Sequence, residues 1–179
     1  MSFEIIQGDL FDPSHNFNAL AQGVNTRGIM GSGIAVDFRE KFPAMYEGYL
    51  DECSKHSSVL PGLLHTWYDE DGGVCVERPA VYNLFSQVHP GVGNASYELL
   101  ERATYLMLQE AEDAMEVFKS YDELVPDLVP DLIDGQFRVG LPWIGCGVGG
   151  LKRYNVEHLF RRFLSDSEVE FVLVEQPER

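Results

Sequence analysis

The chain has 179 residues, which is enough for one domain with a substantial hydrophobic core. Apolar residues make up 45% of it and no run of about 18 apolar residues occurs, which excludes a disordered chain and a membrane span. The formal net charge of −16 disfavours nucleic acid as a general partner, because such binding depends on Lys and Arg side chains that neutralise phosphates.

The cysteine pattern and the N-terminus favour a cytoplasmic protein. Cys53, Cys75 and Cys146 lie far apart and form no CxxC pair, which is typical of reduced thiols. The first ten residues lack the basic, apolar and small-residue regions of a signal peptide. No His, Cys or carboxylate cluster has metal-ligand spacing, so we expect no metal and no cofactor.

Hydrophobic periodicity predicts alternating strands and helices along most of the chain. In order, we expect strands at 3–7 and 19–24, helices at 34–41 and from 43 to about 56, strands at 63–68, 74–77 and 80–86, a helix at 96–119, a strand at 137–141, a helix at 155–164 and a strand at 169–174. This alternation predicts an α/β fold with a largely parallel sheet that is covered on both faces.

One segment departs from the alternation. Residues 124–134 contain a short duplication with two prolines and three aspartates. We interpret the region near 120–135 as an acidic, proline-containing surface insertion within a single domain that covers residues 1–179.

The glycines are concentrated in two short stretches, each between a predicted strand and a predicted helix. Nine of the 17 glycines lie there: Gly23, Gly28, Gly31 and Gly33 in one, and Gly140, Gly145, Gly147, Gly149 and Gly150 in the other. In open α/β sheets, ligands bind outside the carboxyl ends of the strands. Backbone N–H groups at such places hold anionic oxygens, and glycine lets the backbone approach the ligand.

The same two stretches exclude acidic residues. Arg27 is the only charged residue between Ala19 and Ile34, and none lies between Leu141 and Leu151. This distribution predicts a cradle for phosphate, although tight structural turns remain the alternative for either stretch alone. The glycine spacing matches neither the P-loop motif nor the dinucleotide-binding GxGxxG motif.

Three segments together resemble the signature segments of macrodomains. They are residues 7–10, 24–35 and 141–151, in the expected order, and the resemblance extends over nearly the whole chain. The most similar branch contains terminal ADP-ribose glycohydrolases and antitoxins that remove ADP-ribose from DNA. The resemblance implies a three-layer α/β/α sandwich with a mixed, largely parallel central sheet, and ADP-ribose or an ADP-ribosylated substrate as the ligand.

The resemblance also implies roles for individual residues. Asp9 would accept a hydrogen bond from the adenine amino group, with Leu10 beside it; a turn-forming role for Asp9 is the alternative. The first glycine loop, residues 25–35, would hold the distal ribose and part of the diphosphate. The second glycine loop, residues 145–150, would enclose the phosphates and the other side of that ribose. The implied ligand-binding residues of these loops are Asn25, Ile29, Met30, Gly31, Gly33, Ile34, Ala35, Gly145, Cys146, Gly147, Val148, Gly149 and Gly150.

Two departures from this branch concern catalysis. Gln87 stands where the branch has a lysine, and Gly149 stands where some members have an acid. Neither residue can act as a nucleophile or a general base, which disfavours a covalent route through lysine. Asn25 and His89 remain the catalytic candidates, Asn25 to position water or a ribose hydroxyl and His89 as an acid or base. For His89 the alternative is an exposed loop histidine.

Three other residues of the region carry weaker expectations. Arg27 fits either a phosphate contact or an exposed loop position. We expect Asp37 to lie on a solvated helix face and Cys146 to be a small packing residue.

Three functions follow from these patterns. The first is a hydrolase that releases ADP-ribose from a modified target or dephosphorylates ADP-ribose 1″-phosphate. The second is a non-catalytic reader of ADP-ribose, and the third is another kind of nucleotide-binding α/β domain.

Overall fold

The computed structural model describes residues 3–69, 79–124 and 135–177 and contains one six-stranded sheet. The strands are β1 (Phe3–Gln7), β2 (Ala19–Asn25), β3 (Leu64–Trp67), β4 (Ala80–Gln87), β5 (Arg138–Leu141) and β6 (Glu170–Glu175), in the spatial order β1-β6-β5-β2-β4-β3. All neighbouring pairs are parallel except β3 and β4, which are antiparallel. The predicted mixed, largely parallel sheet is therefore confirmed.

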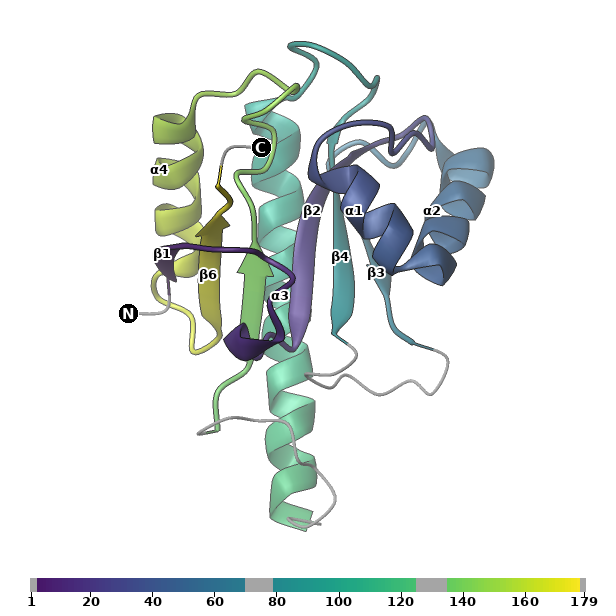
Figure 1. The fold of residues 1–179 in the computed structure, drawn as a ribbon. Helices are drawn as coiled ribbons and strands as arrows, with labels where there is room; N and C mark the ends of the chain where they lie inside the picture. The colour runs from purple at the N-terminus through teal and green to yellow at the C-terminus, as the bar shows by residue number, and fades with distance from the viewer. Residues whose placement is uncertain (1–2, 70–78, 125–134, 178–179) are drawn as a thin grey trace.

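Helices cover both faces of this sheet. The helices are α1 (Ile34–Lys41), α2 (Pro43–His56), α3 (Tyr97–Leu124) and α4 (Arg153–Leu164), with a short 3-10 helix at Pro13–His15. α1 and α2 pack on one face, and α3 and α4 pack on the other (Figure 1). The three-layer α/β/α sandwich is therefore confirmed.

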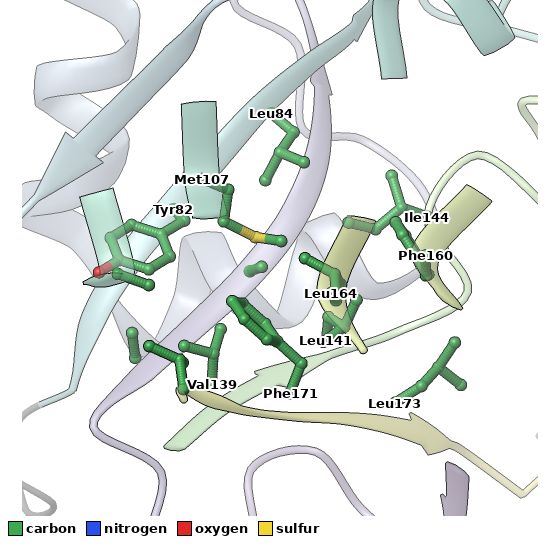
Figure 2. Packing of buried hydrophobic residues seen from close by; sticks show 14 of the residues in the cluster. Tyr82, Leu84, Met107, Val139, Leu141, Ile144, Phe160, Leu164, Phe171 and Leu173 are labelled. Atoms are coloured by element: carbon green, nitrogen blue, oxygen red, sulfur yellow. The ribbon is translucent and has the colours of Figure 1, made fainter. Parts of the chain in front are cut away.

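Strands β2, β4 and β6 contribute side chains to both hydrophobic layers, because successive residues of a strand point to opposite faces. In β4, Tyr82 and Leu84 pack on the α3 side, whereas Val81 and Phe85 pack on the α2 side. Figure 2 shows the first of these layers, in which Met107 of α3 lies beside strand residues such as Leu84. This two-sided burial explains why the strands read as continuous apolar runs rather than as alternating ones.

The elements differ from the predicted ones mainly at their ends. α3 continues to Leu124, five residues beyond the predicted end, because no proline interrupts the helical pattern before Pro126. The 3-10 helix was not predicted, and the carboxylate of Asp12 caps it by accepting from the N–H of Ser14 at 2.9 Å. The strand predicted at 74–77 and most of the predicted insertion lie outside the described residues.

A search of the described helices finds none that is long and apolar enough to cross a membrane.

Candidate functional site

A cavity of about 630 Å³ opens at the carboxyl ends of β2, β4, β5 and β6. Its walls come from both glycine loops and from the segments that follow the other two strands. The lining residues are Gly23, Val24, Asn25, Ile29, Met30, Gly31, Ser32, Gly33, Ile34, Ala35, Ser86, Gln87, Pro90, Gly91, Pro142, Trp143, Ile144, Gly145, Cys146, Gly147, Val148, Gly149, Arg153, Val174 and Gln176. Parallel strands bring these distant segments together, since their carboxyl ends meet at one edge of the sheet.

Among the residues that the structure describes, no carboxylate lines this cavity. The chain contains 29 Asp and Glu residues, yet none of those in the described ranges is a lining residue, and within the same ranges Arg153 is the only charged one. A site for a small anion must exclude like charges from its walls, because they would repel the ligand at short range. The wall composition therefore fits an anionic ligand in an otherwise acidic protein.

Asn25 shapes the first glycine loop through its side-chain amide. Its Nδ2 donates to the carbonyl of Ile29 at 2.7 Å, and its Oδ1 accepts from the N–H groups of Arg27 at 2.9 Å and Ile29 at 3.3 Å. Asn25 is only 4% exposed and lies at the end of β2. Its amide is thus used to hold the loop backbone, which restricts its freedom to position a water molecule.

Three further side chains support the same loop from the helices below it. The Tyr49 hydroxyl donates to the Asn25 carbonyl at 2.6 Å, the Tyr46 hydroxyl to the Gly28 carbonyl at 3.4 Å, and the Arg39 guanidinium to the Met30 carbonyl at 3.0 Å. Burial raises the pKa of the Tyr49 phenol far above its usual value, so this hydroxyl stays protonated and keeps donating. Helices α1 and α2 therefore set the shape of the first glycine loop.

The second glycine loop is held mainly by backbone hydrogen bonds. The N–H groups of Gly93 and Ala95 donate to the carbonyls of Val148 at 3.0 Å and Gly149 at 3.1 Å. Within the loop region, Gly150 N–H donates to Gly147 at 3.1 Å. The segment between β4 and α3 therefore lies directly against the second glycine loop and fixes its carbonyl groups.

Three consecutive N–H groups of the second glycine loop remain unpaired. Within the part of the chain that the structure describes, the N–H groups of Gly147, Val148 and Gly149 donate to no protein acceptor. A Cβ built on Gly147 would meet no atom within 4 Å, and the φ of Gly147 is not positive. Packing and backbone conformation thus leave space beside Gly147, and successive free amides at such a place suit an anion.

Gly149 differs from Gly147 because it is closely packed. A Cβ there would lie 2.7 Å from both the Ala95 Cβ and the Gly145 carbonyl oxygen. Any side chain at this position would displace the segment that holds the second glycine loop. Any side chain at position 149, acidic or not, would therefore strain this packing.

Trp143 and Arg153 form part of the wall that the sequence patterns did not single out. The Arg153 guanidinium carbon lies 5.5 Å from the centre of the Trp143 ring, and Arg153 also pairs with Glu175. A cation over an indole ring is attracted by the negative face of the ring. The apolar and aromatic residues of segment 141–151 could be seen in the sequence. The contact between Trp143 and Arg153 of α4 could not.

Cys146 and Gln87 line the cavity without offering a nucleophile. Burial raises the pKa of the Cys146 thiol to about 11, so it is protonated at neutral pH. Its Sγ lies 3.7 Å from the carbonyl of Ile144, a weak contact within the same loop. The Gln87 side chain is an amide and remains neutral. Neither side chain is therefore a ready nucleophile at neutral pH.

Four of the predicted site residues do not line the cavity. Leu10 is 1% exposed and packs in the core on the α1 side, so it does not lie free beside a ligand. Asp9 is exposed; its Oδ1 accepts from the Phe11 N–H at 3.0 Å and lies 3.5 Å from the amide nitrogen of Gln176. Gln176 does line the cavity, so Asp9 stands one side chain away from it.

Gly150 and His89 are the other two. Gly150 lies just behind the lining residues, where a Cβ would be 3.0 Å from the Gly93 Cα. His89 is exposed at the rim and accepts a hydrogen bond at Nδ1 from Arg27 Nε at 3.3 Å. The remaining predicted residues of the two loops all line the cavity.

Among the described residues, no group of three or more His, Cys, Asp and Glu side chains has an arrangement that could hold a metal ion.

Comparison with known proteins places these features in a family. A family model described as "Macro domain" matches residues 21–160. The chain is 22% identical over 171 residues to an ADP-ribose 1″-phosphate phosphatase of Saccharomyces cerevisiae. This alignment covers 90% of the chain and 92% of the yeast protein. It is 25% identical over 173 residues to a DNA ADP-ribosyl glycohydrolase of Thermus aquaticus, of which it spans 40%.

The fold comparison agrees with the sequence comparison. The solved macrodomain of Thermus aquaticus DarG superposes with a TM-score of 0.68 at 24% identity, and the match covers 98% of both chains. Because the family model covers 140 consecutive residues, including the whole of both glycine loops, this chain belongs to the Macro domain family.

Proposed function

We propose that this macrodomain binds ADP-ribose in the acid-free cavity and hydrolyses the bond between the distal ribose and its substituent. In this arrangement the diphosphate accepts hydrogen bonds from the N–H groups of Gly147, Val148 and Gly149. The adenine lies toward Asp9 and Gln176, and the distal ribose lies toward Asn25. The observation that carries the proposal is the run of three unpaired amides beside the open space at Gly147, in a cavity without carboxylates.

The size and shape of the cavity support a ligand as long as ADP-ribose. A volume of about 630 Å³ is typical of a site for a nucleotide-sized molecule, and lining residues extend from Gln176 to Gln87. The two ends have different chemistry, with the Asp9 carboxylate near one and neutral amide side chains at the other. A carboxylate suits the exocyclic amine of adenine, since an ionised carboxylate can only accept hydrogen bonds.

The proposed chemistry adds water across the bond to the substituent of the distal ribose and releases ADP-ribose and the protonated substituent. Both relatives named above are hydrolases by name, one for ADP-ribose 1″-phosphate and one for ADP-ribosyl DNA. His89 accepts at Nδ1 from Arg27, so its neutral form carries the proton on Nε2. The Nε2–H group of His89 can therefore donate a proton to the leaving group. Asn25 acts by holding the first glycine loop in shape.

A non-catalytic reader is the second candidate, and a specific observation favours it. The resemblance to the glycohydrolase branch implies a lysine at the place of Gln87 and, in some members, an acid at the place of Gly149, and a Cβ at Gly149 would lie 2.7 Å from the Ala95 Cβ. A reader would use the same cavity, the same amides and the same adenine contacts. Only turnover separates the two functions.

One sample tests both functions. Calorimetry with ADP-ribose should give a dissociation constant in the micromolar range, about −8 kcal/mol. The same protein should release phosphate from ADP-ribose 1″-phosphate or ADP-ribose from an ADP-ribosylated oligonucleotide. Binding without release from either substrate would identify a reader, and absence of binding would contradict the proposal. A cytoplasmic location, expected from the cysteine pattern, stays a prediction.

A further inference from the structure

A groove of about 450 Å³ lies between α3 and the edge strand β3, on the α3 side of the sheet. β3 contributes Leu64 and Thr66 to its walls, and α3 contributes Glu110, Glu112 and Asp113. Figure 1 shows β3 as the outermost strand, beyond β4. Of the described residues, none lines both this groove and the cavity of the glycine loops. The groove is therefore a separate feature of the surface.

The free edge of β3 borders this groove. The Phe85 N–H donates to the Leu63 carbonyl at 3.0 Å, so Leu63 is one of the residues whose backbone bonds to β4. In an antiparallel pair such residues alternate with residues whose backbone groups point away from the partner strand. The N–H and carbonyl groups of Leu64 and Thr66 therefore point away from β4, and they bond to no other group of the described residues. β3 also lacks the lysine and proline residues that commonly protect an edge strand.

The opposite wall of the groove is acidic and lacks counter-charges. No lysine or arginine of the described residues forms an ion pair with Glu110, Glu112 or Asp113. Glu110 accepts from the Tyr68 hydroxyl at 2.6 Å, and Glu112 accepts from the Ser167 hydroxyl at 2.8 Å. Both donors are neutral, so they leave the negative charges in place. The wall therefore attracts a cationic group.

The Tyr82 hydroxyl faces the same groove from its buried side and has no partner. Tyr82 is fully buried and lies opposite Thr66 in the strand pair. Figure 2 shows its oxygen turned away from the hydrophobic side chains that surround the ring. Burial raises the pKa of this phenol, and the nearby Tyr68 and Glu110 groups raise it further. Among the described residues this hydroxyl bonds to nothing, which is unusual for a buried polar group. A polar group that enters the groove would supply the missing partner.

We propose that this groove is a docking site for an extended, basic segment of a partner protein, which adds to β3 as a further strand. The backbone of the segment pairs with Leu64 and Thr66, as in other cases of strand addition to a sheet edge. Alternate side chains of a strand point to one face, so lysine or arginine at every second position reaches the acidic wall.

Two other occupants fit the groove less well. A second copy of this chain, paired edge to edge through β3, would bring the same carboxylates toward each other. A metal ion is disfavoured because the described His, Cys, Asp and Glu side chains include no group of three or more that could hold one. Only a basic segment satisfies both the free strand edge and the uncompensated charge.

The test titrates three hexapeptides into the full chain by calorimetry. The first alternates lysine and valine and has blocked ends. The second carries glutamate in place of lysine, which reverses the charge. The third keeps the lysine sequence but is methylated at every backbone nitrogen, which removes the N–H groups that an added strand requires. Wild type should bind the first peptide about tenfold or more tightly than either of the others.

Variants of the protein test each wall separately. Glu110→Gln/Asp113→Asn should weaken binding of the lysine peptide about tenfold, whereas the control Glu98→Gln, an exposed acid of α3 outside the groove, should stay within about twofold. Thr66→Pro removes an outward N–H at an edge position and should weaken binding by a similar factor. In wild type, the lysine peptide should slow hydrogen exchange of the Leu64 and Thr66 amides. Every variant should bind ADP-ribose as wild type does, which reports an intact fold.

The outcomes that overturn the proposal are distinct. Absence of binding by the lysine peptide at millimolar concentration would remove the docking site. Equal binding of the methylated peptide would show attraction of charge without strand addition. Unchanged affinity in Glu110→Gln/Asp113→Asn would remove the acidic wall from the account. A dimer in sedimentation that Thr66→Pro dissociates would assign the edge to a second copy of the chain. If Thr66→Pro does not fold, unchanged exchange of the Thr66 amide in wild type overturns strand addition on its own.

Discussion

The two glycine loops line one cavity, but different kinds of hydrogen bond hold them in place. Side chains hold the first glycine loop: the Asn25 amide and the hydroxyl and guanidinium groups of α1 and α2 all bond to its backbone. Backbone groups hold the second, through the carbonyls of Val148 and Gly149. Because the loop is fixed through these carbonyls, the N–H groups of Gly147, Val148 and Gly149 donate to no acceptor among the described residues, and such groups suit an anion.

This difference predicts which substitutions each glycine loop tolerates. In the first glycine loop a single side-chain truncation removes bonds that define its shape, so the effect should spread along the loop. In the second, an added Cβ at Gly149 or Gly150 meets the neighbouring segment, whereas a Cβ at Gly147 enters the open space proposed for the ligand. The four substitutions below, in order of decreasing expected effect, test this comparison.

Gly147→Glu should have the largest effect on binding. The new side chain would enter open space beside the free amides and place a negative charge next to the diphosphate. We expect loss of ADP-ribose affinity by more than about 100-fold, with the melting temperature within a few degrees of wild type. Val92→Glu is the matched control, since Val92 is 88% exposed and does not line the cavity. Normal binding by Gly147→Glu would show that the second glycine loop is only structural.

Gly149→Ala should instead reduce stability. The added methyl group overlaps Ala95 and the Gly145 carbonyl, and overpacking of this kind costs about 1–3 kcal/mol. Denaturant unfolding should show this loss, whereas Gly147→Ala should change stability by less than about 0.5 kcal/mol. Equal stability of the two variants would contradict the contrast drawn between neighbouring glycines of one loop.

Asn25→Ala tests the side-chain support of the first glycine loop. Removing the amide leaves the N–H groups of Arg27 and Ile29 without an acceptor, at a cost of about 1–2 kcal/mol in stability. Because the loop shape is lost, affinity for ADP-ribose should fall by about the same factor as turnover. Tyr49→Phe, which removes only the hydroxyl bond, should show a weaker form of the same effect. A loss of turnover with unchanged affinity would instead give Asn25 a direct catalytic role.

Cys146→Ala should have the smallest effect of the four. The thiol is protonated at neutral pH, because burial raises its pKa to about 11, and its hydrogen bond to the Ile144 carbonyl is weak. We expect affinity and turnover within about twofold of wild type and stability within about 1 kcal/mol. In wild type, alkylation of this thiol should stay slow at pH 7 and accelerate as the pH approaches 11. A large loss of turnover would mean that a side chain of the second glycine loop takes part in the chemistry.

The sequence predicted most of the fold because the central strands are buried on both sides. Largely apolar runs bounded by turns marked β2 and β4 within one residue, and the shorter apolar segment of the edge strand β1 was also placed correctly. The antiparallel direction of β3 could not be predicted, since it depends on pairing with β4 rather than on residues within β3. The end of α3 was placed five residues too early, although Phe118, Tyr121 and Leu124 continue the spacing of apolar residues to the end of the helix.

The cavity-lining residues within the glycine loops could be predicted from local chemistry. The lining residues that strand pairing and helix packing bring to the cavity were missed. Acid-free glycine loops after strands indicated two walls of the cavity directly. Trp143, Arg153 and Gln176 were missed as wall residues because the pairing of β5 with β6 and the packing of α4 bring them there. The position of Leu10 in the core also could not be inferred, because a single residue after a strand can turn either way.

The most direct test of this account is a calorimetric comparison of ADP-ribose with AMP on wild-type protein. If both glycine loops enclose the ligand, removal of the distal ribose and its phosphate removes contacts with Gly147–Gly149 amides and with the first glycine loop. ADP-ribose should then bind in the micromolar range, about −8 kcal/mol, and AMP at least tenfold more weakly. Equal affinities for the two ligands would contradict the account, because binding would then depend on the adenine end of the cavity alone.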